Sequence, residues 1–313
     1  MTTPALYPIG GTANTLASTG FIPEIWSGKL VEKFYDSTVL AAIANTDYEG
    51  EIKQHGDTVN IRTMPQITLR DYVKGQSLTV ESPDKPKLQL LIDKGDYFAC
   101  VEDDIDKIQS DVKLMDIWSK DASEQMKIKI DQRVLTDLLP DISALNKGAT
   151  AGAKSASFNL GTTGSPVTLT KDGAGGTVSV IDYIVDMGTV LDEANVPESG
   201  RHLVIPAKMA GMIKKSELKD ASLTGDSGTP LRNGRLGMID RFTLYMSHNL
   251  LVSSAKYNLI AGHKMGFTFA SQMTNMETLR AQSTFGNIVR GLQVYGYKVV
   301  KPEALAQGVV QFA

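Results

Sequence analysis

The sequence of 313 residues contains a single cysteine, Cys100, and only four histidines, at positions 55, 202, 248 and 263. One cysteine excludes an intramolecular disulfide and a cysteine-rich zinc site, and it fits a reducing compartment without requiring one. No histidine stands four residues from another, which excludes a paired helical metal site. Cys100 lies in the apolar stretch YFACV, so we interpret it as a buried structural thiol. We expect each histidine to lie at the surface or to be hydrogen-bonded.

Long apolar runs and a strong net charge are also missing. No stretch of about 18 apolar residues is present, so the sequence predicts no membrane-spanning helix. The first residues lack the basic and apolar regions of a signal peptide. The formal charge is −3, from 32 basic and 35 acidic residues, which disfavours a strongly basic nucleic-acid reader. A hydrophobic content of 42% suffices for a sizeable core, and the length predicts about two domains or one elaborated domain.

Motifs that carry chemistry are nearly absent as well. Residues 148–155 resemble a phosphate loop, but three residues instead of four separate the glycines, and Ala153 stands before the lysine. The acidic cluster 102–106 lacks the glycine and the distal glutamate of a calcium loop, so we interpret it as a strand end leading into a helix. Residues 225–228, GDSG, lack the histidine and aspartate context of a serine protease. We therefore expect no catalytic residues, no metal site, no cofactor and no enzymatic activity.

The N-terminal segment has few apolar residues that could anchor it. Residues 1–20 are rich in Thr, Gly, Ala and Pro and predict an extended arm. Pro23 then opens a predicted helix that runs to about Asn45. Because the arm has no core of its own, Trp26 and Phe34 are candidates for packing on a neighbouring subunit.

A long hairpin follows between residues 57 and 101. Apolar residues alternate along 59–63 and again along 88–92, as in half-buried strands. Lys74-Gly75 lies near the middle of the polar excursion between these strands. A two-stranded hairpin with so few apolar residues would be only marginally stable alone, so we expect it to lie on another molecule.

The strongest predicted element is a helix over about 111–139, which Ser110 or Asp111 would cap and Pro140 would end. Its apolar residues recur at steps of four and predict a long packed stripe: Leu114, Trp118, Ala122, Met126, Ile130, Val134 and Leu138. We expect Lys127 and Lys129 to lie on the solvated side. The small Ala122 predicts close approach to a sheet.

The second half of the chain alternates between strand and helix patterns. Residues 146–179 predict a surface loop or short hairpins, and Ser179 caps a predicted helix over 180–195. The next expected elements are a strand at 201–205, a helix beginning at Pro206, a polar loop at 218–236, a strand at 242–246, and several β-prone runs over 257–310. The pattern predicts a mixed α+β fold.

This order of elements resembles the major capsid proteins of tailed bacteriophages, which have the Hong Kong 97-like fold. The segments that carry the resemblance are PEIWSGKLVEKFYDSTVLAAIAN (23–45), GDTVNIRTMP (56–65), YFACVEDDIDKIQS (97–110), VLDEANVPESGRHLVIPAKMAGMI (190–213) and FGNIVRGLQVYGYKVVKPEAL (285–305). The resemblance implies an N-terminal arm at 1–50, an E-loop hairpin at 51–98, a P-domain with the long spine helix at 99–140 and 262–295, and an A-domain at 141–261 and 296–313.

The resemblance implies a protein that self-assembles through non-covalent contacts into the icosahedral shell enclosing packaged phage double-stranded DNA. The implied partners are other copies in hexamers and pentamers, with separate scaffolding, portal and decoration proteins and non-specific contact with DNA, but no membrane. The implied location is the virion, after assembly in the host bacterial cytoplasm. Candidate interface residues are Trp26, Phe34, Arg70, Tyr72 and Lys74.

Two features depart from some members of that family. The chain starts almost directly with the arm, so we expect either that any scaffold is a separate protein or that none is needed. No motif marks Lys74, Lys85 or Lys87 as reactive in a covalent cross-link. An encapsulin-type nanocompartment, which shares the fold, remains an alternative, and so does an enzyme whose site the sequence does not reveal.

Overall fold

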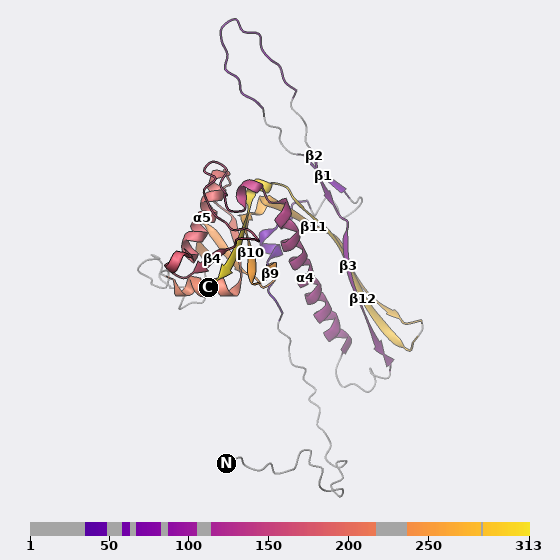
Figure 1. Cartoon of the computed structure of the whole chain (residues 1–313). Helices are drawn as coiled ribbons and strands as arrows, with labels where there is room; N and C mark the ends of the chain where they lie inside the picture. Colours follow the sequence, from indigo (N-terminus) through magenta and orange to yellow (C-terminus); the bar gives the residue numbers. More distant parts are fainter. Residues whose placement is uncertain are drawn as a thin grey trace, which may run out of the picture.

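The computed structural model describes residues 35–48, 58–62, 67–82, 87–104, 114–216, 237–282 and 284–313. Figure 1 shows a large sheet flanked by helices, a long helix beside it, a long narrow sheet on the far side of that helix, and a hairpin that projects from the body. The expected arm at 1–20, Trp26 and Phe34, and the polar loop at 218–236 lie outside the described residues.

The large sheet is mixed, in the order β5-β4-β13-β10-β6-β8-β7, with β9 paired to β10. Neighbouring strands run parallel in β13–β4, β4–β5 and β6–β8 and antiparallel elsewhere. The strands are β4 Val167–Thr170, β5 Val178–Ser179, β6 Arg201–Ile205, β7 Met238–Ile239, β8 Phe242–Met246, β9 Val252–Ser253, β10 Lys256–His263 and β13 Leu305–Phe312.

Two helices connect strands of this sheet, as the sequence predicted. Helix α5 covers Val180–Glu193, and the Ser179 hydroxyl accepts a hydrogen bond from the Ile181 N–H at 3.3 Å. Helix α6 covers Ala207–Lys215 and begins after Pro206. It carries the chain from β6 to the parallel strand β8, a crossover that such a pair requires. The predicted strands at 201–205 and 242–246 are confirmed.

The prediction of a surface loop over 146–179 is wrong in part. This segment contributes β4 to the sheet, and the side chains of Ala151 and Leu160 are fully buried. Small and polar residues dominate the segment, so its few buried apolar positions did not stand out in the sequence. It also contributes β5 at its C-terminal end and the short 3₁₀ turn Ala174–Gly176. Other 3₁₀ turns in the described part of the chain are Ala144–Asn146, Lys264–Gly266 and Pro302–Ala304.

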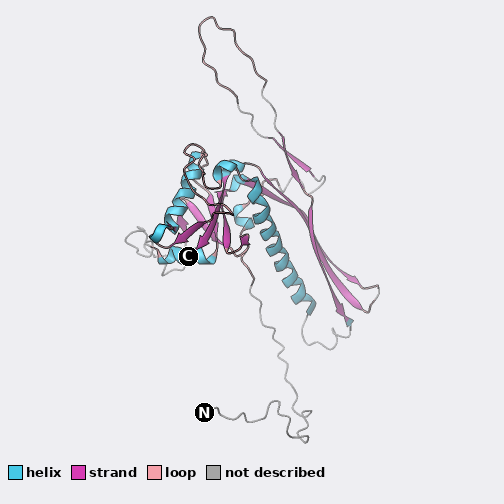
Figure 2. Ribbon diagram, viewed as in Figure 1, coloured by secondary structure: helices cyan, strands magenta, loops and turns pink. Residues whose placement is uncertain are grey.

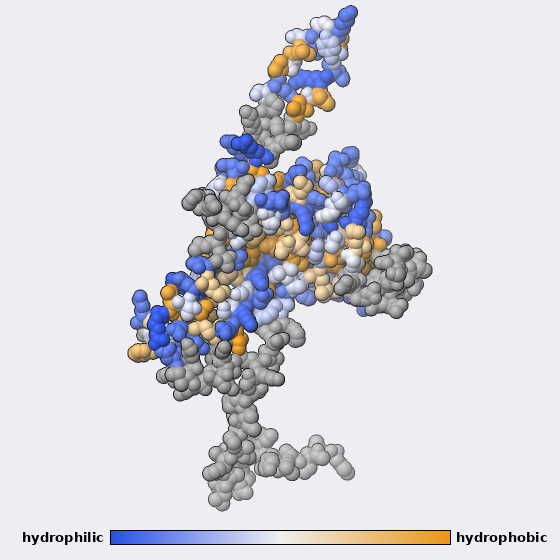
Figure 3. All heavy atoms as spheres, turned by 180° about the vertical axis from the view of Figure 1, so that it is seen from behind, coloured by the Kyte–Doolittle hydropathy of each residue, from blue (hydrophilic) through white to orange (hydrophobic). Residues whose placement is uncertain are grey.

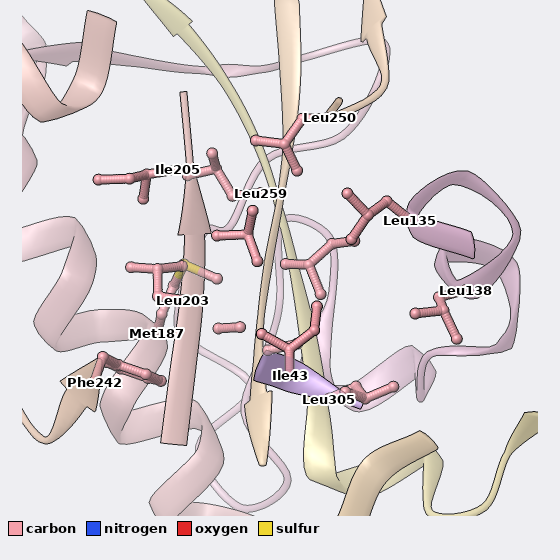
Figure 4. Close-up of a cluster of buried hydrophobic side chains, with 14 of the residues drawn as sticks. Ile43, Leu135, Leu138, Met187, Leu203, Ile205, Phe242, Leu250, Leu259 and Leu305 are labelled. Carbon is pink, nitrogen blue, oxygen red and sulfur yellow. The ribbon is translucent and has the colours of Figure 1, made fainter. Parts of the chain in front are cut away.

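The long helix α4 covers Leu114–Asp141 and packs the second half of its length on the large sheet. Figure 4 shows Leu135 and Leu138 of α4 facing Ile43, Leu259 and Leu305 in one continuous cluster. Pro140 does not stop the helix, which ends one residue later. The predicted helix over 23–45 is represented, among described residues, only by the single turn α1 at Leu40–Ile43, because residues 35–39 are not helical.

A separate three-stranded sheet has the order β11-β12-β3 and is antiparallel throughout. Its strands are β11 Phe267–Arg280, β12 Gly286–Val299 and β3 Lys94–Asp103. Figure 2 shows α4 running along one face of this sheet. Helix α4 therefore joins the large sheet to the three-stranded sheet.

The predicted hairpin is confirmed at its base. Strand β1, Thr58–Arg62, pairs antiparallel with β2, Lys87–Leu91, and the side chains of Ile61 and Leu90 are buried. Residues 67–82 form no strand and project away from the body (Figure 1), with a turn at Lys74 and Gly75. Gly75 has φ +88°, a conformation that favours glycine.

Candidate subunit interface

The projecting segment 67–82, hereafter the ribbon, is rich in exposed apolar side chains (Figure 3). Six large hydrophobic residues are between 63% and 94% exposed: Ile67, Leu69, Tyr72, Val73, Leu78 and Val80. So many exposed large apolar side chains in one short segment are uncommon on a monomer and mark a site of interaction.

The ribbon has a polar face and an apolar face. Arg70 and Glu81 contact each other across it, with 3.7 Å between Nη2 and Oε2, and Glu81 also accepts a hydrogen bond from the Thr68 N–H at 2.8 Å. An extended backbone directs successive side chains to opposite faces. If the ribbon follows this alternation, Leu69 and Val80, each next to one member of that ion pair, are expected on the opposite face.

Three of the candidate interface residues lie on this ribbon and are exposed: Arg70, Tyr72 and Lys74. Arg70 contacts Glu81 within the same subunit. Trp26 and Phe34 lie outside the described residues. The apolar residues at 67, 69, 78 and 80 were not among the predicted interface residues. Their period-two spacing on either side of Lys74-Gly75 was the signal that could have identified them.

A second exposed surface, with apolar side chains on both sides of the ion pair between Arg290 and Glu277, covers one face of the three-stranded sheet. Tyr97 lies opposite Leu292 in the register of β3 and β12, and Ile288 lies between Val101 and Leu279. Tyr97 is 78% exposed and Val101 is 53% exposed. We name this surface the outer sheet face, defined by Tyr97, Val101, Leu279, Ile288 and Leu292.

The opposite face of that sheet contacts α4 through a buried carboxylate. Asp96 is 5% exposed and accepts hydrogen bonds from Lys129 Nζ at 2.5 Å, Tyr295 Oη at 2.7 Å and Arg133 Nη1 at 3.3 Å. Burial acts to raise the pKa of Asp96, but the bonds from Lys129 and Tyr295 and the charge of Arg133 outweigh it and lower the pKa. Lys129 is exposed, as expected for the solvated side, but its ammonium group also contacts the buried Asp96.

The predicted stripe on α4 packs only over its C-terminal half. Ile130, Val134 and Leu138 are buried, and Met126 packs on the core from a partly buried position. Ala122 is half-buried and Trp118 is 38% exposed, which contradicts the expected packing there. Leu114 is the first residue of the helix, and the structure does not describe the placement of its side chain.

A groove of about 310 Å³ separates α4 from the three-stranded sheet at this level. Ser123, Met126, Phe98, Met276 and Gly291 lie among its lining residues. The N-terminal half of α4 thus stands over this sheet across a groove, while the C-terminal half is embedded in the main core.

Two residues depart from their sequence-based interpretation. His202 on β6 is 2% exposed, and neither ring nitrogen has a hydrogen-bond partner among the described residues, so it is neither a surface nor a hydrogen-bonded histidine. Burial, followed by the charges of His263 and Lys264, lowers the pKa of His202 to about 3. Cys100 is half-buried on β3 instead of fully buried, because it stands near the far end of a sheet that only α4 covers.

The remaining motifs offer no chemical site within the described part of the chain. In the glycine-rich loop at 148–155, the N–H groups of Lys154 and Ser155 donate to Glu193 at 2.9 and 3.0 Å, so a carboxylate already occupies the position of an anion. No group of three or more His, Cys, Asp or Glu side chains could hold a metal ion there. No described helix is long and apolar enough to cross a membrane.

The comparison with known families decides the class of protein. A family model described as phage capsid protein matches residues 87–308, which is most of the chain. The chain belongs to the phage capsid protein family. This capsid protein is accordingly a subunit of a bacteriophage shell located in the virion, and the encapsulin alternative is not favoured. Membership in a family of structural proteins favours a non-enzymatic role.

Solved structures give the same fold over the full length of the capsid protein. A structure from Mycobacterium phage Che8 is 27% identical, with a TM-score of 0.74, and the match covers 95% of this chain and 98% of that chain. The cyanophage Pam1 capsid asymmetric unit is 14% identical, with a TM-score of 0.68 and coverages of 96% and 99%. The bacteriophage PhiM1 mature capsid is 15% identical, with a TM-score of 0.65 and coverages of 100% and 99%. No curated protein matches the sequence.

Proposed function

We propose that this major capsid protein builds its shell from hexamers and pentamers whose subunits are joined by non-covalent contacts, with the ribbon of each copy lying on a neighbour. The proposal includes the Hong Kong 97-like division into an arm (1–50), an E-loop (51–98), a P-domain (99–140 and 262–295) and an A-domain (141–261 and 296–313). Assembly takes place in the host bacterial cytoplasm, with scaffolding, portal and decoration proteins as separate partners.

The observation that carries the proposal is the apolar face of the ribbon. Leu69 is 94% exposed and Val80 is 92% exposed, so neither side chain contributes to the core of its own subunit. Fully burying such a side chain is worth about 1.5–3 kcal/mol. Repetition of this contact around every capsomer makes individually modest contacts sufficient for a closed shell.

The outer sheet face supplies an apolar surface that can receive such a ribbon. Tyr97 and Val101 on β3 stand exposed on the side of the sheet that α4 does not cover. Two apolar surfaces on one chain, each unable to contact the other within the subunit, favour pairing between copies. We propose that the ribbon of one copy lies on the outer sheet face of the next.

The experiment compares two double variants of the ribbon. Leu69→Asn with Val80→Asn changes the apolar face, while Arg70→Gln with Glu81→Gln changes only the polar face. Because all four positions lie outside the core, both variants should unfold at the same denaturant concentration as the wild type. The apolar-face variant should give few or no closed shells by electron microscopy, while the polar-face variant assembles. Normal shells from the apolar-face variant would contradict the proposal.

Contact with packaged DNA is proposed to be weak and independent of sequence. A chain with a net charge of −3 cannot neutralise packaged DNA, so small cations must provide most counterions. Local lysine and arginine side chains would give only salt-sensitive contacts. A filter-binding assay should find no tight, sequence-dependent binding at physiological salt.

A further inference from the structure

Residues 35–48, hereafter the strap, cross the subunit and contact all of its main parts. At one end, the Ser37 hydroxyl donates to the carbonyl oxygen of Met246, the last residue of β8, at 3.0 Å. At the other end, Asn45 accepts a hydrogen bond from the Phe269 N–H of β11 at 2.9 Å. Leu40 and Ile43 between them are buried in the main core. The strap therefore links the large sheet to the three-stranded sheet.

A buried carboxylate on α4 holds the centre of the strap. Asp131 is fully buried, and its Oδ1 accepts hydrogen bonds from the backbone N–H groups of Val39 at 3.2 Å and Leu40 at 2.9 Å. Its Oδ2 accepts a hydrogen bond from Asn249 Nδ2 at 2.7 Å. One side chain of the long helix thus contacts both the strap and the turn that follows β8.

The chemistry of this cluster is unusual for a core. The described residues provide Asp131 with no cationic partner, and burial raises the pKa of its carboxyl against the opposing effect of its hydrogen bonds from Asn249, Val39 and Leu40. A buried charge held only by N–H donors is costly unless all its bonds are made in correct geometry. Such a cluster tolerates one arrangement of its elements and resists small displacements.

We propose that Asp131 is a positioning residue that locks α4 and its sheet to the large sheet at a fixed orientation, and so determines the shell geometry. The second half of this statement rests on the proposed function, because it requires assembly into a shell. The lock itself is a property of the single subunit. In the proposed shell the outer sheet face meets a neighbouring copy, so a change in its orientation relative to the large sheet would alter the angle between subunits.

The test uses an isosteric substitution that preserves volume. In Asp131→Asn, one oxygen can still accept from the strap, but the new amide N–H₂ faces the N–H₂ of Asn249. Asn249 cannot turn over freely, because its Oδ1 accepts a hydrogen bond from Gln132 Nε2 at 3.2 Å. The double variant Asp131→Asn with Asn249→Asp restores one donor and one acceptor across the pair. Asp116→Asn, at an exposed position near the start of α4, is the matched control.

The first readout is hydrogen exchange in unassembled subunits. In Asp131→Asn, the amides of Val39 and Leu40, and of Phe269 at the far end of the strap, should exchange at least about tenfold faster. The double variant should recover most of this protection, and Asp116→Asn should leave it unchanged. Unchanged exchange in Asp131→Asn would overturn the lock. If Asp131→Asn fails to fold, Asn249→Ala, which removes the donor to Asp131 and the acceptor of the Gln132 bond, tests the same contact.

The second readout is the distribution of shell diameters by electron microscopy. Asp131→Asn should broaden or shift the distribution, and the double variant should restore it. If Asp131→Asn exchanges faster but still forms shells of wild-type diameter, the proposal that Asp131 determines the shell geometry would be overturned. Failure of the wild type itself to form shells would instead contradict the proposed function, and the exchange data would still test the lock.

Discussion

Lys129 on α4 donates a hydrogen bond from its ammonium group to Asp96 on β3 at 2.5 Å. The Lys129 side chain is 59% exposed, while that of Asp96 is 5% exposed. A long side chain can keep most of its surface in water and still satisfy a buried partner with its terminal atom. The contact therefore links the helix to the three-stranded sheet and helps to set the distance between them.

Replacing Lys129 with alanine should therefore reduce the free energy of unfolding by about 1 kcal/mol. Arg133 and Tyr295 still satisfy Asp96, and the exposure of the lysine limits the loss. Lys127→Ala removes only an exposed pair with Glu124 and should cost less than about 0.5 kcal/mol. Urea unfolding of unassembled subunits measures both. Equal values would mean that the contact with Asp96 adds nothing to stability.

Acidification should destabilise the subunit partly through His202. Its folded pKa of about 3 lies below its ordinary value of 6.5, so as pH falls the unfolded chain binds a proton that the folded chain does not. This contribution is complete above pH 6.5 and is lost towards pH 3, at up to about 1.4 kcal/mol per pH unit. His202→Leu should flatten the pH dependence of the unfolding free energy over this range, while His248→Gln at the surface should not. An identical slope in His202→Leu would contradict the depressed pKa.

The two halves of α4 should respond differently to truncation. Ile130→Ala should cost about 2–5 kcal/mol, because the side chain is embedded in the main core. Trp118→Ala should cost clearly less despite the larger volume removed, since the indole is 38% exposed. Ala122→Phe faces a half-buried site and should cost less than overpacking of a closed core, below about 1 kcal/mol. Thermal unfolding of the isolated subunits ranks the three, and a larger loss at Trp118 than at Ile130 would reverse the assignment.

Two glycines with left-handed backbone provide a matched comparison. Gly75 has φ +88° and open space around it, so Gly75→Ala should cost only the conformational strain, about 1 kcal/mol. Gly161 has φ +83°, and a Cβ there would meet the Val309 carbonyl oxygen of β13. Gly161→Ala should therefore cost several kcal/mol or prevent folding, because backbone cannot move aside cheaply. Similar melting temperatures for the two variants would show that β13 can shift.

The sequence was most informative where local signals were strong. Helix α5 and strand β6 have nearly the predicted bounds, because Ser179, Pro197 and Pro206 mark their ends without help from the rest of the fold. The base of the hairpin was equally readable from its period of two. The mixed α+β class followed from these elements.

The predicted packing of the apolar stripe was wrong over the N-terminal half of α4 for a geometric reason. A step of four residues turns a helix by about 40° more than one full turn, so residues in such a row rotate steadily around the axis. Trp118 and Leu138 are five such steps apart, which places them on roughly opposite sides of α4. No local pattern could show that the main core covers one side and only a narrow sheet covers the other.

The partners of Asp131 and Asp96 could not be predicted either. Leu40 and Asp131 are 91 residues apart, and Asp96 and Tyr295 are 199 residues apart. In the sequence these carboxylates look like ordinary solvated residues of helix and strand. Only the folded arrangement shows that each one joins separate elements.

The backbone around Arg70 and Lys74 forms no strand in the single subunit and stands clear of the body. Trypsin cleaves after arginine and lysine and requires a short stretch of accessible, unpaired backbone, so a free subunit offers it two sites within a few residues. A ribbon seated on a neighbour no longer fits the protease. If the ribbon lies on a neighbour as proposed, the uncut fraction at each time point should follow the share of subunits that have joined a shell, with no label added to the protein.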